Sequence, residues 1–167
     1  ARTVDINQFV KVNDSETLNR IPQNARPYVL QLDLKKYGLN KENFSMTDNI
    51  MSGSIQYPGF YLNDKRQNMS RWPNSGYELI ESVKDKGGRS IQDTIDNYGG
   101  TFSIYSDRIK NWKKAKNMLV EGYLGVTYSG EWQEVKSIDA KNKSITLKSW
   151  TKYGLSKGNR WSINNLI

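Results

Sequence analysis

The sequence predicts an all-β fold, mainly antiparallel, in the form of a β-sandwich or a partly open β-barrel with one or two short helices. Short segments that alternate apolar and polar residues recur along the chain, most clearly in residues 101–105 and 132–139. Gly, Asn, Asp and Pro separate these segments, as is typical of turns. The 5 Trp, 10 Tyr and 4 Phe supply bulky core side chains to a chain whose hydrophobic fraction is only 36%. No repeat or convincing linker divides the chain, so we expect residues 1–167 to form one domain.

Strands are expected wherever an alternating segment is bounded by turn residues. In chain order we expect them at residues 1–12, 28–34, 60–62, 65 onward, 77–83, 101–105, 118–124, 132–139, 144–148 and 161–167. The turns are expected at residues 63–64, 73–76, 140–143 and 157–159, and a loop at residues 40–54.

Two short helices are expected between the strands. Asp14 can cap a helix that runs through Leu18 and stops at Pro22. Asp107 can cap a second helix that runs through Ala115. Trp112 falls on the apolar face of this second helix, so we expect its ring to lie in the core.

Cysteine and histidine are both absent from the sequence. Their absence excludes disulfides, zinc sites built from thiolates or imidazoles, cysteine nucleophiles and Ser-His-Asp triads. We expect no cofactor and no metal site. The net charge of +8 suits an acidic polymer as partner, although the lysines are spread along the chain. No run of about 18 apolar residues is present, so a membrane partner is not expected.

Two pairs of carboxylates are spaced by three residues, Glu78 with Glu81 and Glu131 with Glu134. In a strand this spacing puts the members on opposite faces, which does not suit the paired acids of a glycosidase. We interpret all four as surface carboxylates and expect no catalytic residue. Residues 139–144 faintly resemble a calcium loop but lack its later acidic ligands, so a hairpin turn is the preferred interpretation.

Arg71, Trp72 and Tyr77 surround the turn at residues 73–76 and allow two interpretations. In the first, Trp72 fills the core and Arg71 bonds to a carbonyl or carboxylate. In the second, Trp72 or Tyr77 packs against a sugar, because the axial C–H groups of sugars favour aromatic faces. The sequence leaves both interpretations open.

Three further aromatic residues lie in or beside the C-terminal strands: Trp132, Trp150 and Tyr153. Trp150 and Tyr153 come just after a hairpin arm, so we expect them to be an exposed aromatic pair. Together with the three residues around the turn at 73–76, they complete the set of candidate glycan-binding residues.

Two stretches of the sequence carry a resemblance. The first contains Gly-Phe-Tyr-Leu-Asn-Asp-Lys-Arg at residues 59–66 and Ser-Arg-Trp-Pro-Asn at residues 70–74. The second runs from Asp-Arg at residues 107–108, through Ile-Thr-Leu at 145–147, to Asn-Leu at 165–166. Both resemble the β-sandwich insertion domain of right-handed parallel β-helix enzymes similar to glycoside hydrolase family 141. The sequence departs from that pattern at Asp64, in place of a turn Gly, and at three positions where the family tends to carry Trp: Leu119, Leu124 and Val126.

The resemblance implies a non-catalytic accessory domain of a polysaccharide-degrading glycoside hydrolase, because the catalytic carboxylates of that family lie in the β-helix. The implied partners are a polysaccharide or oligosaccharide, acidic ones included, and the parallel β-helix catalytic domain of the same parent chain. The parent would be a secreted bacterial enzyme, extracellular or periplasmic, with its signal outside residues 1–167.

Two alternatives stay open. The domain could serve only to brace the β-helix, or it could be a basic module that binds anionic polymers such as acidic glycan or nucleic acid. Nucleic acid is the less favoured of these ligands, because the sequence contains no recognisable nucleic-acid motif.

Overall fold

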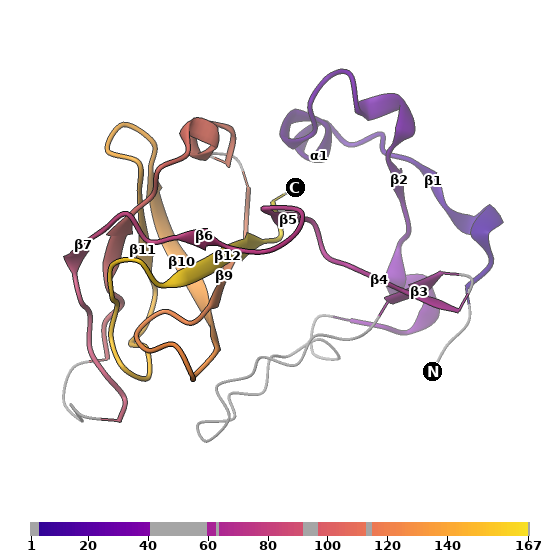
Figure 1. Ribbon diagram of the computed structural model, residues 1–167. Helices are drawn as coiled ribbons and strands as arrows, with labels where there is room; N and C mark the ends of the chain where they lie inside the picture. Colours follow the sequence, from indigo (N-terminus) through magenta and orange to yellow (C-terminus); the bar gives the residue numbers. More distant parts are fainter. Residues whose placement is uncertain (1–3, 41–59, 63, 92–96, 113–114, 167) are drawn as a thin grey trace. The chain divides into compact units, whose positions relative to one another are not determined.

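The computed structural model describes residues 4–40, 60–62, 64–91, 97–112 and 115–166 (Figure 1). Its internal contacts divide the chain into two compact units, Ala1–Ser45 and Met46–Ile167. We call them the N-terminal unit and the β unit and describe each by itself. The expectation of a single domain over residues 1–167 stays a prediction.

The N-terminal unit consists of short elements. They are the 3-10 turn Ile6–Gln8, β1 (Val10–Lys11), α1 (Ser15–Arg20), the 3-10 turn Arg26–Tyr28, β2 (Leu30–Gln31) and the 3-10 turn Leu34–Tyr37, and β1 pairs antiparallel with β2. The expected helix cap is confirmed, because the Asp14 carboxylate accepts a hydrogen bond of 2.7 Å from the backbone N–H of Thr17.

The strand expected at residues 28–34 is mostly wrong. Only Leu30–Gln31 is extended, and a 3-10 turn lies on each side of it. Pro27 occupies the start of the preceding turn, where its fixed φ favours a helical conformation. The Asp33 side chain caps the following turn by accepting from the N–H of Lys35. Local capping therefore overrides the alternating pattern. The loop expected at residues 40–54 lies almost wholly outside the described residues.

The β unit begins with the expected small hairpin, formed by β3 (Phe60–Leu62) and β4 (Lys65–Gln67). Asp64 adopts the left-handed conformation with φ 59°, which the tight turn requires and which Asp tolerates better than most residues. The hairpin prediction is confirmed, with Asn63 outside the described residues.

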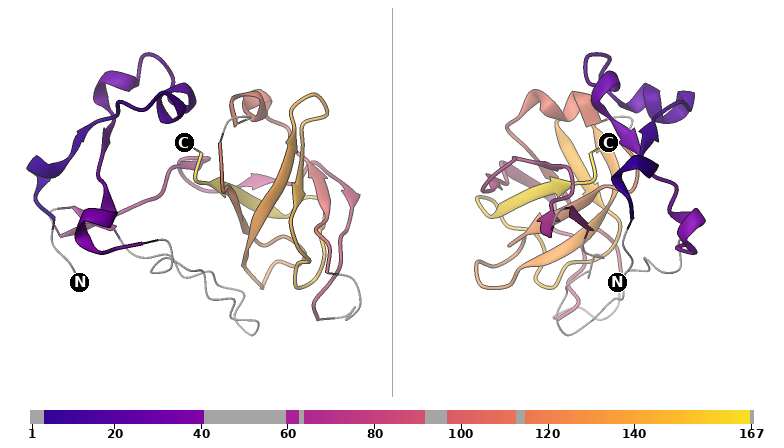
Figure 2. Two further views of the ribbon diagram at one scale, coloured as in Figure 1. Left: turned by 180° about the vertical axis from the view of Figure 1, so that it is seen from behind. Right: turned by 90° about the vertical axis from the view of Figure 1, so that its right-hand side faces the viewer.

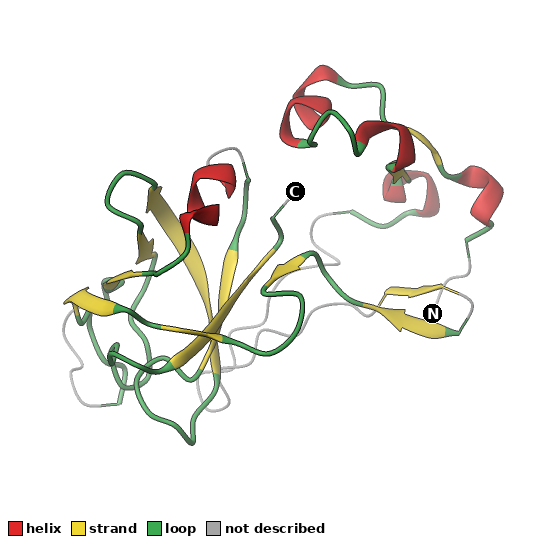
Figure 3. Cartoon of the chain, turned by 45° about the horizontal axis from the view of Figure 1, so that its top comes forward, coloured by secondary structure: helices red, strands yellow, loops and turns green. Residues whose placement is uncertain are grey.

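Among the described residues, eight further strands form one sheet in the order β5-β12-β9-β10-β11-β8-β7, with β6 also paired to β12. The strands are β5 (Arg71–Trp72), β6 (Glu78–Leu79), β7 (Ser82–Asp85), β8 (Thr101–Ser103), β9 (Leu119–Gly122), β10 (Glu131–Asp139), β11 (Ser144–Leu147) and β12 (Arg160–Asn164). All of the pairings between these strands are antiparallel. The predicted all-β, mainly antiparallel fold class is confirmed, and the helical segments are short (Figure 3).

The sheet curls around its own core, as the views in Figure 2 show. Trp161 on β12 and Phe102 on β8 are separated by three strands in the sheet, yet their rings meet edge to face with centroids 5.3 Å apart. The register of β10 against β11 shifts between Val135 and Ser137, and such a bulge bends a strand. Within the described strands the curled sheet does not close into a barrel.

Aromatic rings fill the centre of this core. Trp161 is fully buried, and Trp72 packs between Trp161 and Trp112 with ring centroids at 5.8 and 5.3 Å. Trp112 ends the 3-10 segment Asp107–Trp112, which replaces the α-helix expected to run through Ala115. The core interpretation of Trp112 is confirmed, and Trp72 packs against this core while staying partly exposed.

The strand expected at residues 77–83 is interrupted. Glu78–Leu79 pairs with β12, whereas Ser82–Asp85 pairs with β8. Between them, the N–H of Ile80 donates to Asn159 O and the N–H of Glu81 donates to Ser103 O. The chain therefore changes partner at these two residues and connects two parts of the curled sheet.

Candidate functional site

Arg71 and Tyr77 lie on the two sides of the turn at residues 73–76, as the sequence indicated. Gly76 takes the left-handed conformation with φ +68°, which brings its carbonyl back toward β5. The Arg71 Nη2 atom donates to Gly76 O at 3.0 Å, and its Cζ atom lies 5.6 Å from the centroid of the Tyr77 ring. The turn thus holds a guanidinium against an aromatic ring that is 41% exposed.

A second tyrosine completes this cluster. The rings of Tyr77 and Tyr123 meet edge to face, with centroids 6.2 Å apart. Burial raises the pKa of the Tyr77 phenol, and the negative charge of Glu121 raises it further, whereas Arg71 and Arg160 act in the opposite direction. The Tyr77 hydroxyl therefore lies in the combined field of two arginines and one carboxylate.

Strand register explains why these groups share one face of the sheet. Glu121 on β9 lies directly opposite Ser162 on β12 and Trp132 on β10, and directly opposite residues point to the same face. The Ser162 hydroxyl is 3.4 Å from Glu121 Oε2. The neighbouring register pair, Gly122 with Trp161, carries the buried Trp161 ring and so faces the core. Trp132, one of the expected site residues, is half-buried on the face of Glu121.

A second pair of tyrosines is formed by Tyr128 and Tyr153, with ring centroids 5.8 Å apart. Tyr128 is 75% exposed, and a hydrogen bond with it is the main reason why the pKa of the Tyr153 phenol is raised. The β9–β10 connection, residues 123–130, thus supplies one member of each tyrosine pair. A Cβ atom at Gly125 would lie 2.8 Å from Tyr153 Cβ, so this connection packs closely on the segment that carries Tyr153.

Glu131 contradicts its interpretation as a surface carboxylate. It is only 3% exposed, and its Oε2 atom accepts hydrogen bonds from the Lys152 backbone N–H at 3.1 Å and from Gln133 Nε2 at 3.0 Å. Burial raises the pKa of the Glu131 carboxyl above its usual value of 4.5. The carboxyl therefore anchors the backbone next to Tyr153.

The expectation that Trp150 and Tyr153 form an exposed pair is wrong, since both side chains are half-buried. Backbone bonds hold this segment on several sides. The N–H of Trp150 donates to Asn97 Oδ1 at 3.1 Å, and the N–H of Thr151 donates to Gly88 O at 3.2 Å. The ring against which Tyr153 packs is that of Tyr128, which the sequence interpretation did not include.

The structure therefore brings Arg71 and Tyr77 together and packs Trp72 against the core. Sequence reasoning missed Tyr123 and Tyr128 as site residues. Tyr128 lies among Gly, Thr and Ser residues between two predicted strands, and an aromatic side chain in such a turn was a signal of exposure.

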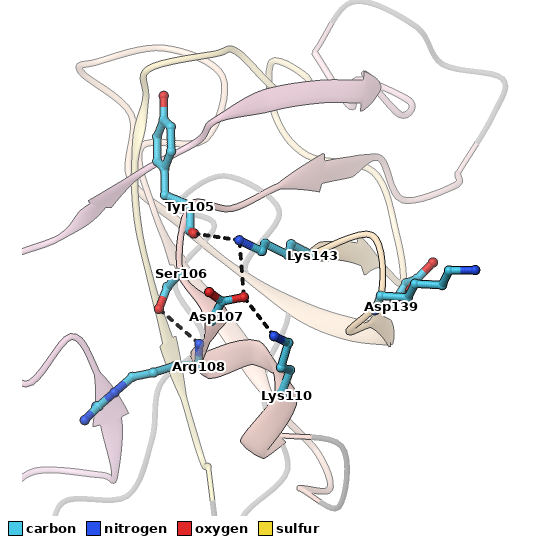
Figure 4. A network of polar contacts seen from close by, with 8 residues as sticks. Tyr105, Ser106, Asp107, Arg108, Lys110, Asp139 and Lys143 are labelled. Atoms are coloured by element: carbon cyan, nitrogen blue, oxygen red, sulfur yellow. Dashed lines mark hydrogen bonds and ion pairs between the residues drawn. The ribbon is translucent and has the colours of Figure 1, made fainter.

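A separate polar network surrounds Asp107, at the start of the 3-10 segment (Figure 4). Its Oδ1 atom lies 3.0 Å from Lys110 Nζ and 3.2 Å from Lys143 Nζ. Hydrogen bonds from these two lysines, Lys110 first, lower the pKa of the Asp107 carboxyl. The pairing with Lys143 connects the 3-10 segment to the turn between β10 and β11.

Asp139 closes the turn between β10 and β11. Its side chain accepts from the N–H groups of Lys141 and Asn142 at 2.9 and 3.0 Å, and from Asn142 Nδ2 at 2.6 Å. These bonds make a hairpin turn, as preferred over a calcium loop. Within the described ranges, no group of three or more acidic side chains is placed to hold a metal ion.

None of the helices in the described part of the chain is long and apolar enough to cross a membrane. No protein family model matches the sequence, and no curated protein or solved structure matches it at a significant level. The resemblance to the insertion domain of family 141 enzymes therefore stays a prediction.

Proposed function

We propose that the β unit is a non-catalytic module that binds polysaccharide through its two tyrosine pairs, Tyr77 with Tyr123 and Tyr128 with Tyr153. The observation that carries this proposal is the β9–β10 connection, which supplies a ring to each pair. Pyranose rings present axial C–H groups that pack on aromatic faces, and neighbouring polar side chains then bind the hydroxyls. Arg71, outside the connection, is one such neighbour.

The framework of the site favours binding by a preformed surface. Backbone hydrogen bonds fix the chain on both sides of the tyrosines, since Tyr123 N–H donates to Arg160 O at 2.9 Å and Lys152 N–H donates to Glu131. A backbone held in this way does not have to be ordered when a ligand binds.

A binding role also fits the arrangement of the carboxylates better than a hydrolytic one. Glu131 has the raised pKa that a general acid requires, but it is 3% exposed and bonded to the Lys152 backbone. Glu134 forms an ion pair with Lys148. In line with the resemblance, we propose that the chain belongs to a larger extracellular or periplasmic polysaccharide-degrading enzyme. Its role there would be to bind the polysaccharide substrate rather than to cleave it.

Affinity electrophoresis of the full chain through gels that contain different polysaccharides tests this proposal. We expect at least one polysaccharide to retard the protein. Tyr77→Ala and Tyr128→Ala should each weaken that binding about tenfold. Each substitution removes an aromatic ring, and covering the apolar face of such a ring contributes about 1.5 kcal/mol to the binding free energy.

Tyr105→Ala is the matched control, since Tyr105 is 56% exposed but belongs to neither pair. An unchanged mobility in every gel would refute sugar binding and leave a bracing role. Equal losses in the Tyr105 and Tyr77 variants would show that the tyrosine pairs are not the binding surface.

A further inference from the structure

Two arginines lie near the exposed Tyr77 ring, and in the described part of the chain neither forms an ion pair with a carboxylate. Arg71 stacks on the ring and donates to the Gly76 carbonyl. Arg160 on β12 lies directly opposite Leu79 on β6, two residues after Tyr77, and its charge reaches the Tyr77 hydroxyl. Within the described residues, no carboxylate lies within ion-pair distance of either guanidinium. The lysines of the Asp107 network and Lys148 differ in this respect, because carboxylates of the protein neutralise them.

Two buried N–H donors lie on the same face of the sheet as these arginines. The Nε atom of Arg71 and the Nδ2 atom of Asn164 are both buried and have no acceptor in the described part of the structure. Arg71 and Asn164 are direct register partners on β5 and β12, so their side chains share one face of the sheet. Donors without an acceptor add positive potential to this face, and a negatively charged group is the ligand that such a potential favours.

The charge of Glu121 does not cancel this preference. Its carboxylate lies at hydrogen-bond distance from the Ser162 hydroxyl, and the charges of two guanidinium groups oppose its effect on the Tyr77 hydroxyl. Two arginines and one glutamate leave a net positive charge around a ring on which a sugar can stack. A guanidinium is planar and matches a carboxylate, which is also planar, through two parallel hydrogen bonds.

We propose that the part of the site formed by Tyr77, Tyr123, Arg71 and Arg160 selects uronic acid residues, with the sugar ring on Tyr77 and its carboxylate between the arginines. This inference rests on the proposed function, because it names the class of sugar that the same surface would bind. It assigns the specificity to two residues on β5 and β12 rather than to the overall charge of the chain.

The experiment compares polyuronates with their neutral esters, so that only the carboxylate differs. Alginate and its propylene glycol ester form one pair of ligands, and polygalacturonate and its methyl ester form the other. We expect the full chain to bind at least one acid form about tenfold or more tightly than its ester, from the strength of a charge-assisted hydrogen bond. Arg160→Gln should remove most of that ratio, and so should Arg71→Gln.

The controls separate local recognition from bulk charge. Arg71→Gln also removes a bond to the turn, so the exposed Arg160 supplies the variant that does not depend on the turn. Arg108→Gln removes the same charge elsewhere, at an exposed side chain that points away from Asp107 in Figure 4, and should keep the full ratio. Thermal unfolding of each variant verifies that the fold is retained.

The remaining outcomes distinguish failure of the uronate inference from failure of the proposed function. Equal binding of acid and ester forms would refute the uronate inference and leave the proposed function intact. Equal losses in the Arg108 and Arg160 variants, or equally tight binding of dextran sulfate, would show general attraction of polyanions and also refute it. If no polysaccharide binds, acid or neutral, the proposed function itself fails, and the inference fails with it.

Discussion

Gly122 on β9 packs directly against the backbone of β12, and its replacement by alanine is expected to separate the two strands. A Cβ atom at this position would lie 2.1 Å from Arg160 O and 2.7 Å from Trp161 Cα. Both are backbone atoms of β12, which cannot move aside as the end of a flexible side chain can. The strands would have to part by roughly 1.4 Å to reach an ordinary contact distance of about 3.5 Å.

The cost of this separation follows from two effects. Forcing an extra methyl into a packed region costs about 1–3 kcal/mol. The hydrogen bond from the Tyr123 N–H to Arg160 O, 2.9 Å long, would weaken as well, at about 0.5–1.5 kcal/mol. We therefore expect Gly122→Ala to lower the free energy of unfolding by about 3 kcal/mol and the melting temperature by about 10 °C.

Urea and thermal unfolding, followed by far-UV circular dichroism, measure the effect. Gly130→Ala is the matched control, because its Cβ atom would find its nearest neighbour, Tyr123 Cε1, at 3.7 Å. That variant should stay within about 0.5 kcal/mol of the parent protein. A Gly122→Ala protein within about 1 kcal/mol of the parent would refute the close approach of β9 and β12.

Three further predictions concern the core and the buried and exposed carboxylates. Because burial raises the pKa of Glu131, its stabilising contribution is complete below the usual value of 4.5 and is lost as the pH rises through the folded value. Urea unfolding at pH 4, 6 and 8 should therefore show the parent losing stability relative to Glu131→Gln as the pH rises, and a constant difference would contradict this. Phe102→Ala should cost about 3–5 kcal/mol in the same assay, because the Phe102 ring is fully buried against Trp161; a smaller loss than about 1 kcal/mol would exclude Phe102 from the core. The pKa of Asp107 is lowered, so the stability it provides is present above its usual value of 3.8 and is lost as the pH falls. Asp107→Asn should weaken the acid dependence of the melting temperature, and an unchanged profile would argue against the pairing with Lys110 and Lys143.

Local patterns in the sequence predicted those elements that local interactions determine. The hairpin formed by β10 and β11 combines clear alternation in both arms with an Asp139 that bonds to its own turn, so the sequence was sufficient. The prediction of a strand at residues 28–34 was wrong because Pro27 and Asp33 favour 3-10 turns on either side of Leu30–Gln31. The alternating polarity of this segment was therefore not sufficient to predict a strand. The change of partner at Ile80 was not predictable, since it depends on β8 and β12, both distant in sequence.

In the candidate site, too, the sequence predicted the local contacts but not the long-range ones. Arg71 and Tyr77 meet across a short turn, and the sequence identified both. The partnership of Tyr77 with Tyr123 depends on the pairing of β9 with β12. The partnership of Tyr128 with Tyr153 depends on the packing of the β9–β10 connection against another segment. No period or turn signal in the sequence encodes such long-range contacts, and the burial of Trp150 escaped prediction for the same reason.

Nuclear magnetic resonance mapping of a bound oligosaccharide tests the central claim most directly. The probe is an oligosaccharide of the polysaccharide that binds most tightly in the electrophoresis screen, titrated into the uniformly labelled full chain. We predict that the largest shift changes fall on the amides and ring protons of Tyr77, Tyr123, Tyr128 and Tyr153, while Tyr105 and the Asp107 network stay unchanged. Shift changes centred on the Asp107 network, or spread over the lysines with no change at the four tyrosines, would contradict the account.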